Sequence, residues 1–394
     1  QDGINAVAEG GTVIVYAGAY HEHLTVGKSL SLLGPQQGVD PTGGARTNPA
    51  NEAIVDLDGV GVTNPNILVA VAPGVSDVTI DGFALHGSHT YHYADEDVIR
   101  AYGDNIEVKN NIIAGYVGVH YPGTGSGLSV TQNFIGVNKT GVYIQFSATN
   151  ATISGNIITP FGAPAGDAAG IYMAGTNGFT VADNTVNSFA GSQAFGGNGN
   201  TNGTVSGNHF TANKKGISFW GTTANLTISG NELSNNSERG IDLKGANVNI
   251  TGNEINDNGD AGVRIATHVG ATDGITLSNN TITGNTNTGV LVDENVAGVA
   301  INSGEIDGSL VGLMLKGVSG WTLDAGSTQF GSGLTEFVRL DASTADVDAT
   351  SASFDGAADD AAIEAKVWHD VDVATLGHVD WGQGAATSTN LSVQ

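Results

Sequence analysis

The sequence predicts an all-β fold, a right-handed parallel β-helix solenoid of about a dozen coils with a C-terminal cap. A phrase made of a β-branched strand, then Gly-Asn or Asn-Asn, then an apolar residue recurs about every 23 residues. A second short strand, introduced by Gly, occurs once in each repeat. The chain has 59 glycines but only 8 prolines among 394 residues. With no G-X-Y period and many Val, Ile and Leu, this composition excludes collagen and disorder.

The Asn of the recurring phrase marks a bend that repeats from coil to coil. It falls at Asn111, Asn133, Asn156, Asn184, Asn208, Asn231, Asn253 and Asn280. The flanking segments are rich in Val, Ile and Thr, which is typical of strands and not of helical repeats. Stacked Asn side chains can form a hydrogen-bonded ladder. We therefore interpret these residues as structural, not as ligands or glycosylation sites.

One domain is expected, with residues 1–358 as the β-helix and 359–381 as its C-terminal cap. The Asn bend disappears from about residue 320, and a short amphipathic stretch follows. A cap is needed because the open end of a stack of strands is an adhesive edge. Residues 382–394 are typical of a linker-like tail. The chain starts at Gln1 without Met, so we expect a processed product or a piece of a longer protein.

The charge balance excludes several classes of partner. Thirteen basic against 39 acidic residues give a net charge of −26. Such a field repels nucleic acid and anionic membranes. The chain has no Cys, and no apolar run is long enough to span a membrane. We expect a secreted or cell-surface protein of bacterial origin, with neither a nucleic-acid partner nor a membrane span.

The opening segment GGTVIVYAGAYHEHLTVGKSLSLLG, residues 10–34, carries a family resemblance. GTVIVYAGAY, Glu22 and KSLSLLG (28–34) resemble the first coil of the pectate-lyase-like β-helix superfamily. That superfamily includes pectin methylesterases and the periplasmic, copper-binding type of accessory protein of nitrous oxide reductase. The resemblance implies the fold over nearly the whole chain. It implies no single activity, because this coil occurs in enzymes and non-enzymes, and the methylesterase motifs are not found here.

Period-two alternation in the Gly-led strands predicts a row of outward side chains. In chain order the row is Arg100, Tyr102, His120, Tyr143, Gln145, Tyr172, Phe195, Ser218, Trp220, Asp242, Lys244, Arg264, His268, Leu291, Asp293, Met314 and Lys316. Stacked rings suit the flat faces of sugars, and charges beside them suit hydroxyls or carboxylates. We assign substrate binding to Arg100, Tyr102, His120, Tyr143, Trp220, His268 and Asp293. The alternative is that the rings only stabilise the sheet, at about 0.2–1 kcal/mol per pair.

The charges in the row suggest chemistry on a uronate polymer. Five basic residues lie close together in the sequence: Lys214, Lys215, Arg239, Lys244 and Arg264. In β-helix lyases and epimerases a cation neutralises the uronate carboxylate, and a base removes the proton at C5. Here Lys244 or Arg264 is the expected base, and Tyr172 or His268 the acid. The alternative chemistry is hydrolysis by Asp242 and Asp293, two coils apart. Ordinary surface ion pairs are a third interpretation.

Two further segments bear on metals. The insertion at 86–100 carries His86, His89 and His92 at every third position, followed by Asp95, Glu96 and Asp97. A His/Asp metal site there is weighed against a loop of solvated His, and no metal ligand is assigned. Acidic turns such as NDNGDAG (256–262) make Ca²⁺ the one cofactor considered, without an EF-hand pattern.

Two classes of function follow. The first is a secreted polysaccharide-active protein, a lyase or epimerase in preference to a glycoside hydrolase or transglycosidase. The second is a non-catalytic adhesin or spacer module of a larger secreted protein. The expected partner is a polysaccharide or surface glycan, and side-by-side homotrimers are an assembly open to such solenoids.

Overall fold

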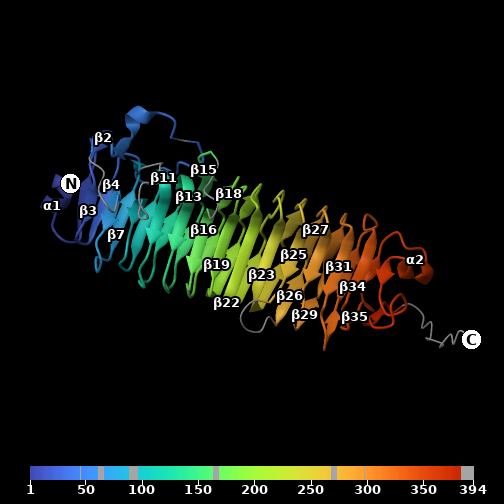
Figure 1. Ribbon diagram of the computed structural model, residues 1–394. Helices are drawn as coiled ribbons and strands as arrows, with labels where there is room; N and C mark the ends of the chain where they lie inside the picture. Colours follow the sequence, from blue (N-terminus) through green and yellow to red (C-terminus); the bar gives the residue numbers. More distant parts are fainter. Residues whose placement is uncertain are drawn as a thin grey trace, which may run out of the picture.

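The computed structural model describes residues 1–44, 46–60, 66–87, 96–162, 168–267, 273–296 and 298–382. These residues form a right-handed parallel β-solenoid of about 11 turns, as predicted. Figure 1 shows an elongated rod in which the coils follow one another from the blue N-terminal end to the red C-terminal end. Each strand pairs in parallel with its counterpart in the next coil.

The strands form three sheets that run the length of the rod. Sheet I contains β1 (Gly11–Ile14), β4 (Leu30–Leu33), β7 (Val78–Asp81), β10 (Ile106–Lys109), β12 (Ser129–Thr131), β14 (Thr152–Ser154), β17 (Thr180–Ala182), β20 (Thr201–Ser206), the second halves of β22 (Lys215–Ser229) and β23 (Arg239–Thr251), β26 (Ile275–Ser278), β29 (Val299–Ile301), β32 (Thr322–Asp324), β35 (Asp346–Asp348) and β38 (Val379–Asp380).

Sheet II follows sheet I in each coil. It contains β2 (Gly18–His21), β5 (Ala53–Asp56), β8 (Ala84–His86), the first halves of β11 (Ile112–Tyr121) and β13 (Phe134–Ile144), β15 (Ile157–Pro160), β18 (Thr185–Asn187), β21 (His209–Thr211), β24 (Glu254–Asn256), β27 (Asn280–Thr283), β30 (Ser303–Asp307), β33 (Ser327–Phe330) and β36 (Ser353–Phe354).

Sheet III carries the Gly-led strands. It contains β3 (Leu24–Val26), β6 (Val69–Val71), β9 (Asp97–Arg100), the second halves of β11 and β13, β16 (Ala169–Ala174), β19 (Gln193–Asn198), the first halves of β22 and β23, β25 (Ala261–Ile265), β28 (Thr288–Val292), β31 (Val311–Lys316), β34 (Glu336–Asp341) and β37 (Val367–Trp368). The α-helices described are α1 (Asp2–Ala6) and α2 (Asp360–Glu364), at opposite ends of the rod (Figure 1).

Alternate side chains of each strand fill one continuous apolar core. Ile241 and Leu243 flank Asp242 in β23, and both are fully buried while Asp242 lies on the outer side. This alternation is as predicted, with one correction. Phe195 is not outward: it is fully buried, pairs in register with Ile217, and packs edge-on against Phe179 and Phe219. The outward position of β19 belongs to Gly196.

The predicted Asn ladder is present at the bend between sheets I and II. Asn133 donates from Nδ2 to Asn156 Oδ1 at 3.0 Å, and Asn156 donates to Asn184 at 2.9 Å. The same contact repeats through Asn231, whose Nδ2 donates to Asn253 Oδ1 at 2.9 Å. Because each side chain also binds backbone carbonyls, the buried amides are satisfied.

A second ladder was not predicted. Asn213, Asn236, Asn258 and Asn285 stack at the bend between sheets II and III, with Nδ2 of Asn236 and Asn258 donating at 3.0 and 2.8 Å to the next Oδ1. Each follows a first-ladder Asn by five residues. That constant offset was a readable signal in the sequence.

A long insertion lies along the outside of the first coils. It joins β4 to β5 and includes the 3-10 turn Pro49–Asn51. The Arg46 side chain, fully buried, pairs with Glu52 and donates to the backbone carbonyls of Phe83 and Asn110. A single guanidinium thereby holds the insertion against coils that come later in the sequence.

Candidate functional site on the outer face of sheet III

Register places one outward residue of each sheet III strand in a continuous line. From β9 onward the line is Arg100, His120, Tyr143, Tyr172, Gly196, Ser218, Asp242, Arg264, Leu291 and Met314. Every member of this line except Gly196 belongs to the predicted row, which also held a second position in most strands: Tyr102, Gln145, Trp220, Lys244, Asp293 and Lys316. The alternation of the Gly-led strands was sufficient to find it.

The row begins in a buried polar cluster. Arg100 and His120 are 6% and 8% exposed. Both contact Oδ2 of buried Asp97, Arg100 through Nε and His120 through Nδ1 at 2.9 Å. His120 Nε2 lies 3.1 Å from Gln145 Oε1. Two of the predicted substrate-binding residues are thus engaged with Asp97, and Tyr102 lies half-buried in the turn after β9.

Aromatic rings continue the row. The His120 and Tyr143 rings are stacked, with centroids 4.8 Å apart and planes 7° apart. Tyr143 meets Tyr172 edge-on at 5.5 Å, and Tyr172 meets Trp220 at 5.9 Å. Burial and then the neighbouring Tyr143 raise the pKa of the Tyr172 hydroxyl. At neutral pH Tyr172 is therefore a protonated phenol, able to donate.

A hollow of about 480 Å³ lies beside these rings. Because Gly196 has no side chain, nothing in the row stands between Tyr172 and Ser218. The hollow is lined by Lys139, Thr140, Tyr143, Tyr172, Gly191, Ser192, Gln193, Lys214, Lys215 and Trp220. It combines aromatic faces, amide and hydroxyl groups, and ammonium groups, which is a suitable set for a sugar that carries an anionic substituent.

Three cations surround the carboxylate of Asp242, which is 4% exposed. Lys215 Nζ donates to Oδ2, Arg239 approaches Oδ2 at 3.3 Å, and Arg264 approaches Oδ1 at 3.3 Å. Burial raises the pKa of Asp242, but the Lys215 hydrogen bond and the three positive charges outweigh it, so the pKa lies below its ordinary value. Asp242 is ionised at neutral pH.

Arg264 lies between the two carboxylates considered for hydrolysis. Its Nε donates to Asp293 Oδ2 at 2.8 Å, and its Nη1 faces Asp242. Burial lowers the pKa of Arg264, whereas the charges and hydrogen bonds of Asp242 and Asp293 raise it. The carboxylates outweigh burial, so the pKa lies above its ordinary value. The guanidinium is held as a cation and is a poor base. A hydrolase needs one carboxyl group protonated as the acid, which this arrangement does not favour for Asp242.

The predicted catalytic residues are not all brought together. Tyr172 and the strand of Lys244 are three strand spacings apart, about 14 Å at 4.7–4.9 Å each. Lys244 is half-buried and has no ion pair among the described residues. Lys214 and Lys215, which the sequence placed only in a basic patch, line the hollow together with Tyr172. His268 lies outside the described residues.

Most of the basic residues lie in or beside the strands of sheet III. Ten of the 13 basic side chains lie in strands of sheet III or beside their first residues: Arg100, Lys139, Lys214, Lys215, Arg239, Lys244, Arg264, Lys316, Arg339 and Lys366. Only Lys28, Arg46 and Lys109 lie elsewhere. In a chain with a net charge of −26, this is a strong local bias.

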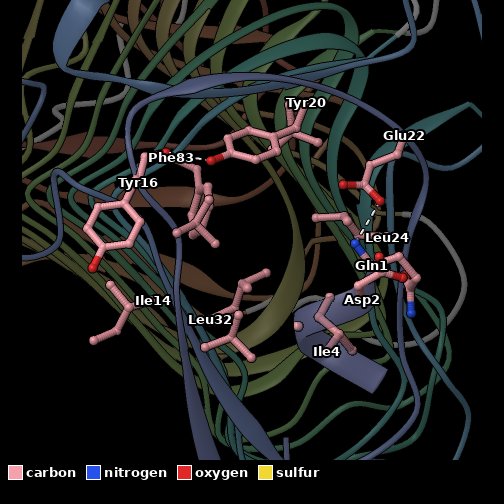
Figure 2. A pocket seen from close by; sticks show the side chains of 14 residues that line it. Gln1, Asp2, Ile4, Ile14, Tyr16, Tyr20, Glu22, Leu24, Leu32 and Phe83 are labelled. Carbon is pink, nitrogen blue, oxygen red and sulfur yellow. Dashed lines mark hydrogen bonds and ion pairs between the residues drawn. The ribbon is translucent and has the colours of Figure 1, made fainter. Parts of the chain in front are cut away.

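A separate cavity of about 350 Å³ opens at the N-terminal end of the rod (Figure 2). Its walls include Ile4 of α1 and Tyr20, whose hydroxyl donates to the Tyr16 carbonyl at 2.9 Å. Leu24, Leu32 and Phe83, all part of the apolar core, form its interior side. We interpret this cavity as the end of the solenoid interior, distinct from the sheet III face.

The segments considered for metals have varied surroundings. His89, His92 and Asp95 lie outside the described residues, whereas His86 is at the end of β8 and Glu96 is buried. In the acidic turn 256–262, Asp260 pairs with Arg239 at 2.9 Å. A His21, Asp56 and Asp58 group brings three ligand atoms together on the surface of the first coils.

No helix in the described part of the chain is long and apolar enough to cross a membrane. The cap predicted for residues 359–381 includes α2, β37 and β38, and residues 383–394 of the tail lie outside the described residues.

Comparisons with known proteins agree with this architecture. A family model described as a right handed beta helix region matches residues 69–224 and 141–306. Among solved structures, DFA-IIIase from Arthrobacter chlorophenolicus A6 in complex with GF2 is 14% identical, with a TM-score of 0.54 over 74% of this chain and 84% of that chain.

Two further structures match with lower TM-scores. The Dettilon tailspike protein is 15% identical, with a TM-score of 0.45 over 84% of this chain and 61% of that chain. The GH87 alpha-1,3-glucanase of Streptomyces thermodiastaticus strain HF3-3 is 15% identical, with a TM-score of 0.46 over 90% and 63%. This chain spans less than two thirds of both proteins. No curated protein matches. The similarity is one of fold.

Proposed function

Since the chain belongs to the right-handed β-helix family, we propose that it binds an acidic polysaccharide along the outer face of sheet III. The observation that carries the proposal is the hollow, in which the rings of Tyr172 and Trp220 lie with Lys214 and Lys215. Sugar rings present flat C–H faces to aromatic side chains, and uronate carboxylates accept hydrogen bonds from ammonium groups. The DFA-IIIase structure, a complex with GF2, is an enzyme on a similar fold. With such a ligand, we also propose that the protein acts outside the cell, as a secreted or surface protein.

The concentration of cations on one sheet supports an anionic ligand in preference to a neutral one. Asp242, Asp293 and Glu238 hold several of these cations in place. An anionic chain laid along the row therefore meets donors that are already oriented, at a small cost in side-chain entropy. Lys214 is the most accessible of them, 42% exposed and 3.3 Å from Glu238.

Binding is tested with polygalacturonate and alginate against a neutral glucan, measured by titration calorimetry. Replacing Tyr172 and Trp220 together by Ala removes two stacking surfaces, each worth about 0.5–1.5 kcal/mol. We expect Kd to rise about tenfold or more. The control is Tyr16→Ala, which removes a 78% exposed ring elsewhere. Equal binding of every glycan by the double variant and the wild type would overturn the proposal.

The preference for an acidic glycan has its own matched pair of variants. Lys214→Ala removes an ion-paired lysine at the hollow, and Lys109→Ala removes one on sheet I, 2.8 Å from Glu107. We expect only the first to weaken binding of the polyuronate, and to leave binding of the neutral glucan unchanged. An equal loss of polyuronate affinity in both variants would show that the effect comes from the net charge of the protein and not from the hollow.

Catalysis is a second candidate, because the Tyr172 phenol and the Lys215 ammonium line the same hollow. In an elimination, a cation holds the uronate carboxylate, a base removes the C5 proton, and Tyr172 donates a proton to the departing glycosidic oxygen. In an epimerisation, a base removes the C5 proton and Tyr172 returns a proton to the opposite face of C5. Incubation with polyuronates, with and without Ca²⁺, is followed by absorbance of unsaturated uronate and by reducing ends. Absorbance lost in Tyr172→Phe supports a lyase. Reducing ends alone favour hydrolysis, and neither signal with retained binding identifies an adhesin or spacer module. A side-by-side homotrimer stays a prediction.

A further inference from the structure

Two histidines and two carboxylates meet in the C-terminal cap, far along the chain from the sheet III hollow. His369 directly follows β37 and is 1% exposed, and His378 directly precedes β38. Nδ1 of His369 lies 2.7 Å from Asp370 Oδ1, and Nδ1 of His378 lies 3.1 Å from the same oxygen. One ligand atom from each of these three residues thus falls within 4.8 Å of the others.

The far nitrogen of His369 is also engaged. Its Nε2 lies 3.1 and 3.2 Å from the two carboxylate oxygens of Glu364, the last residue of α2. A neutral imidazole has only one N–H. With a carboxylate at each nitrogen, His369 directs a lone pair at a carboxylate unless a cation is present or the ring carries a second proton.

Negative charge is in excess around the two rings. Besides Glu364 and Asp370, Asp372 accepts the backbone N–H of His369 at 3.1 Å, and Asp346 accepts that of His378 at 2.7 Å. Trp381 closes one side, with its ring 5.8 Å from that of His369. A buried imidazole with four carboxylates nearby is an environment that a divalent cation would neutralise.

We propose that this cluster is a transition-metal site, occupied by a divalent ion such as Zn²⁺. The ligands are Nδ1 of His369, Nδ1 of His378 and a carboxylate oxygen of Asp370, with the fourth position open to water. Nε2–H of His369 donates to Glu364, the carboxylate–histidine–metal arrangement that fixes the tautomer of a ligating imidazole. Imidazole nitrogen favours Zn²⁺, Cu²⁺ or Ni²⁺ over Ca²⁺.

The ion links the two ends of the loop that runs from Asp370 to His378. The loop between Asp370 and His378 closes with the Asp370 N–H donating to Gly377 O at 3.1 Å, and Gly377 N–H donating to Ser343 O at 2.9 Å. Coordination by residues at both ends of this loop holds it against the last coil. The site therefore stabilises the cap against local opening.

The first measurement is Zn²⁺ stoichiometry by equilibrium dialysis of the full chain. The wild type is expected to bind one more ion than His378→Ala, a substitution at a 59% exposed side chain that leaves the core intact. The control is His209→Ala, because His209 is 58% exposed and pairs with Glu232 at 2.7 Å, and the described residues bring no third ligand to this pair. Since the His21 group offers its own ligands, the difference between variants is decisive, not the total.

The second measurement is hydrogen exchange of the peptide spanning 367–382. At a free Zn²⁺ concentration 100 times Kd, cap opening is expected to be about 100-fold rarer. That protection is expected to disappear in His378→Ala and in Asp370→Asn, and Ca²⁺ is expected to give none. Equal Zn²⁺ binding by the wild type and both variants, or no gain in protection of this peptide, would overturn the proposal. Glycan binding by sheet III is independent of either result.

Discussion

At the scale of single residues, Asp242 is the centre of the sheet III charges. One carboxylate receives Lys215, Arg239 and Arg264, which come from three successive strands. The three cations repel one another, and the negative charge of the buried carboxylate offsets this repulsion. The electrostatic stability of the face depends on this one side chain.

Asp242→Asn keeps the shape of the side chain and removes its charge. The three cations then lose their common partner, and we expect the free energy of unfolding to fall by about 2 kcal/mol at pH 7. Urea denaturation measures the change. Asp293→Asn is the matched control, since Arg264 keeps Asp242, and a smaller loss is expected. A greater loss for the control would contradict this account.

The wild type and the Asp242→Asn variant also differ in how their stability depends on pH. The folded-state pKa of Asp242 is lowered, so its contribution is present above the unfolded value of about 3.9 and is lost as pH falls through the folded value. We expect the difference between wild type and Asp242→Asn to be constant from pH 7 to about 5 and to shrink below about 4. Thermal melts across that range test it. A difference that grows toward low pH would have the wrong sign.

Residue alternation predicted most of the row but not its partners. Tyr143, Tyr172 and Asp242 are outward because Gly-led strands alternate regularly. Phe195 was misassigned because Ala194 stands where the neighbouring strands have Gly170 and Gly216, so no Gly marks the start of the count. The pairing of Lys215 with Asp242 crosses to the next coil, and depends on a side-chain reach that no spacing in the sequence expresses.

At the scale of elements, the two Asn ladders join successive coils in the middle of the rod, from Asn111 to Asn285. Asn231 is 1% exposed, donates to the carbonyls of Val205 and Ser229, and bonds to Asn208 and Asn253. Each ladder therefore combines side-chain contacts between coils with satisfaction of the backbone at a bend. The recurrence of Asn about every 23 residues predicted the first ladder. The second ladder lies five residues after the first in each coil that carries both.

Asn231→Ala interrupts the first ladder in the middle of the rod. The substitution leaves buried donors and acceptors without partners, and each costs about 1–3 kcal/mol. We expect a loss of roughly 3 kcal/mol in the free energy of unfolding, measured by urea denaturation. Asn249→Ala, an exposed position of β23, serves as the control with a change below about 0.5 kcal/mol. Equal losses would assign the effect to strand propensity and not to the ladder.

At the scale of the whole molecule, the net charge of −26 is spread over a rod whose cations gather on one sheet. Self-repulsion of the remaining surface destabilises the compact state. We expect the melting temperature to rise by a few degrees between about 0.01 and 0.15 M NaCl, where the Debye length falls from roughly 30 to 8 Å. Sodium chloride that lowers the melting temperature would show that attractive ion pairs dominate instead.

The repeat also predicts that one coil is dispensable. Deleting residues 231–252 joins Gly230 to Asn253 and removes 22 residues. This is the length of one coil, because Asn231 and Asn253 are stacked in adjacent coils 22 residues apart. Coils contact mainly their neighbours, so we expect a folded rod shortened by about 4.8 Å in solution scattering. Deleting residues 242–252 alone removes half a coil and is expected to prevent folding. A folded half-coil variant would contradict the register argument.

The insertion anchored by Arg46 gives the two ends of the rod different mechanics. A stack of coils pulled from its C-terminal end peels apart one coil at a time, because only one interface opens at each step. At the other end, the buried guanidinium binds Glu52 and the carbonyls of Phe83 and Asn110 together, so successive coils are stapled into a single cooperative unit. Force applied at this end is expected to produce one rupture at high force, followed by gradual unfolding of the coils. The two ends of the rod therefore differ in mechanical resistance.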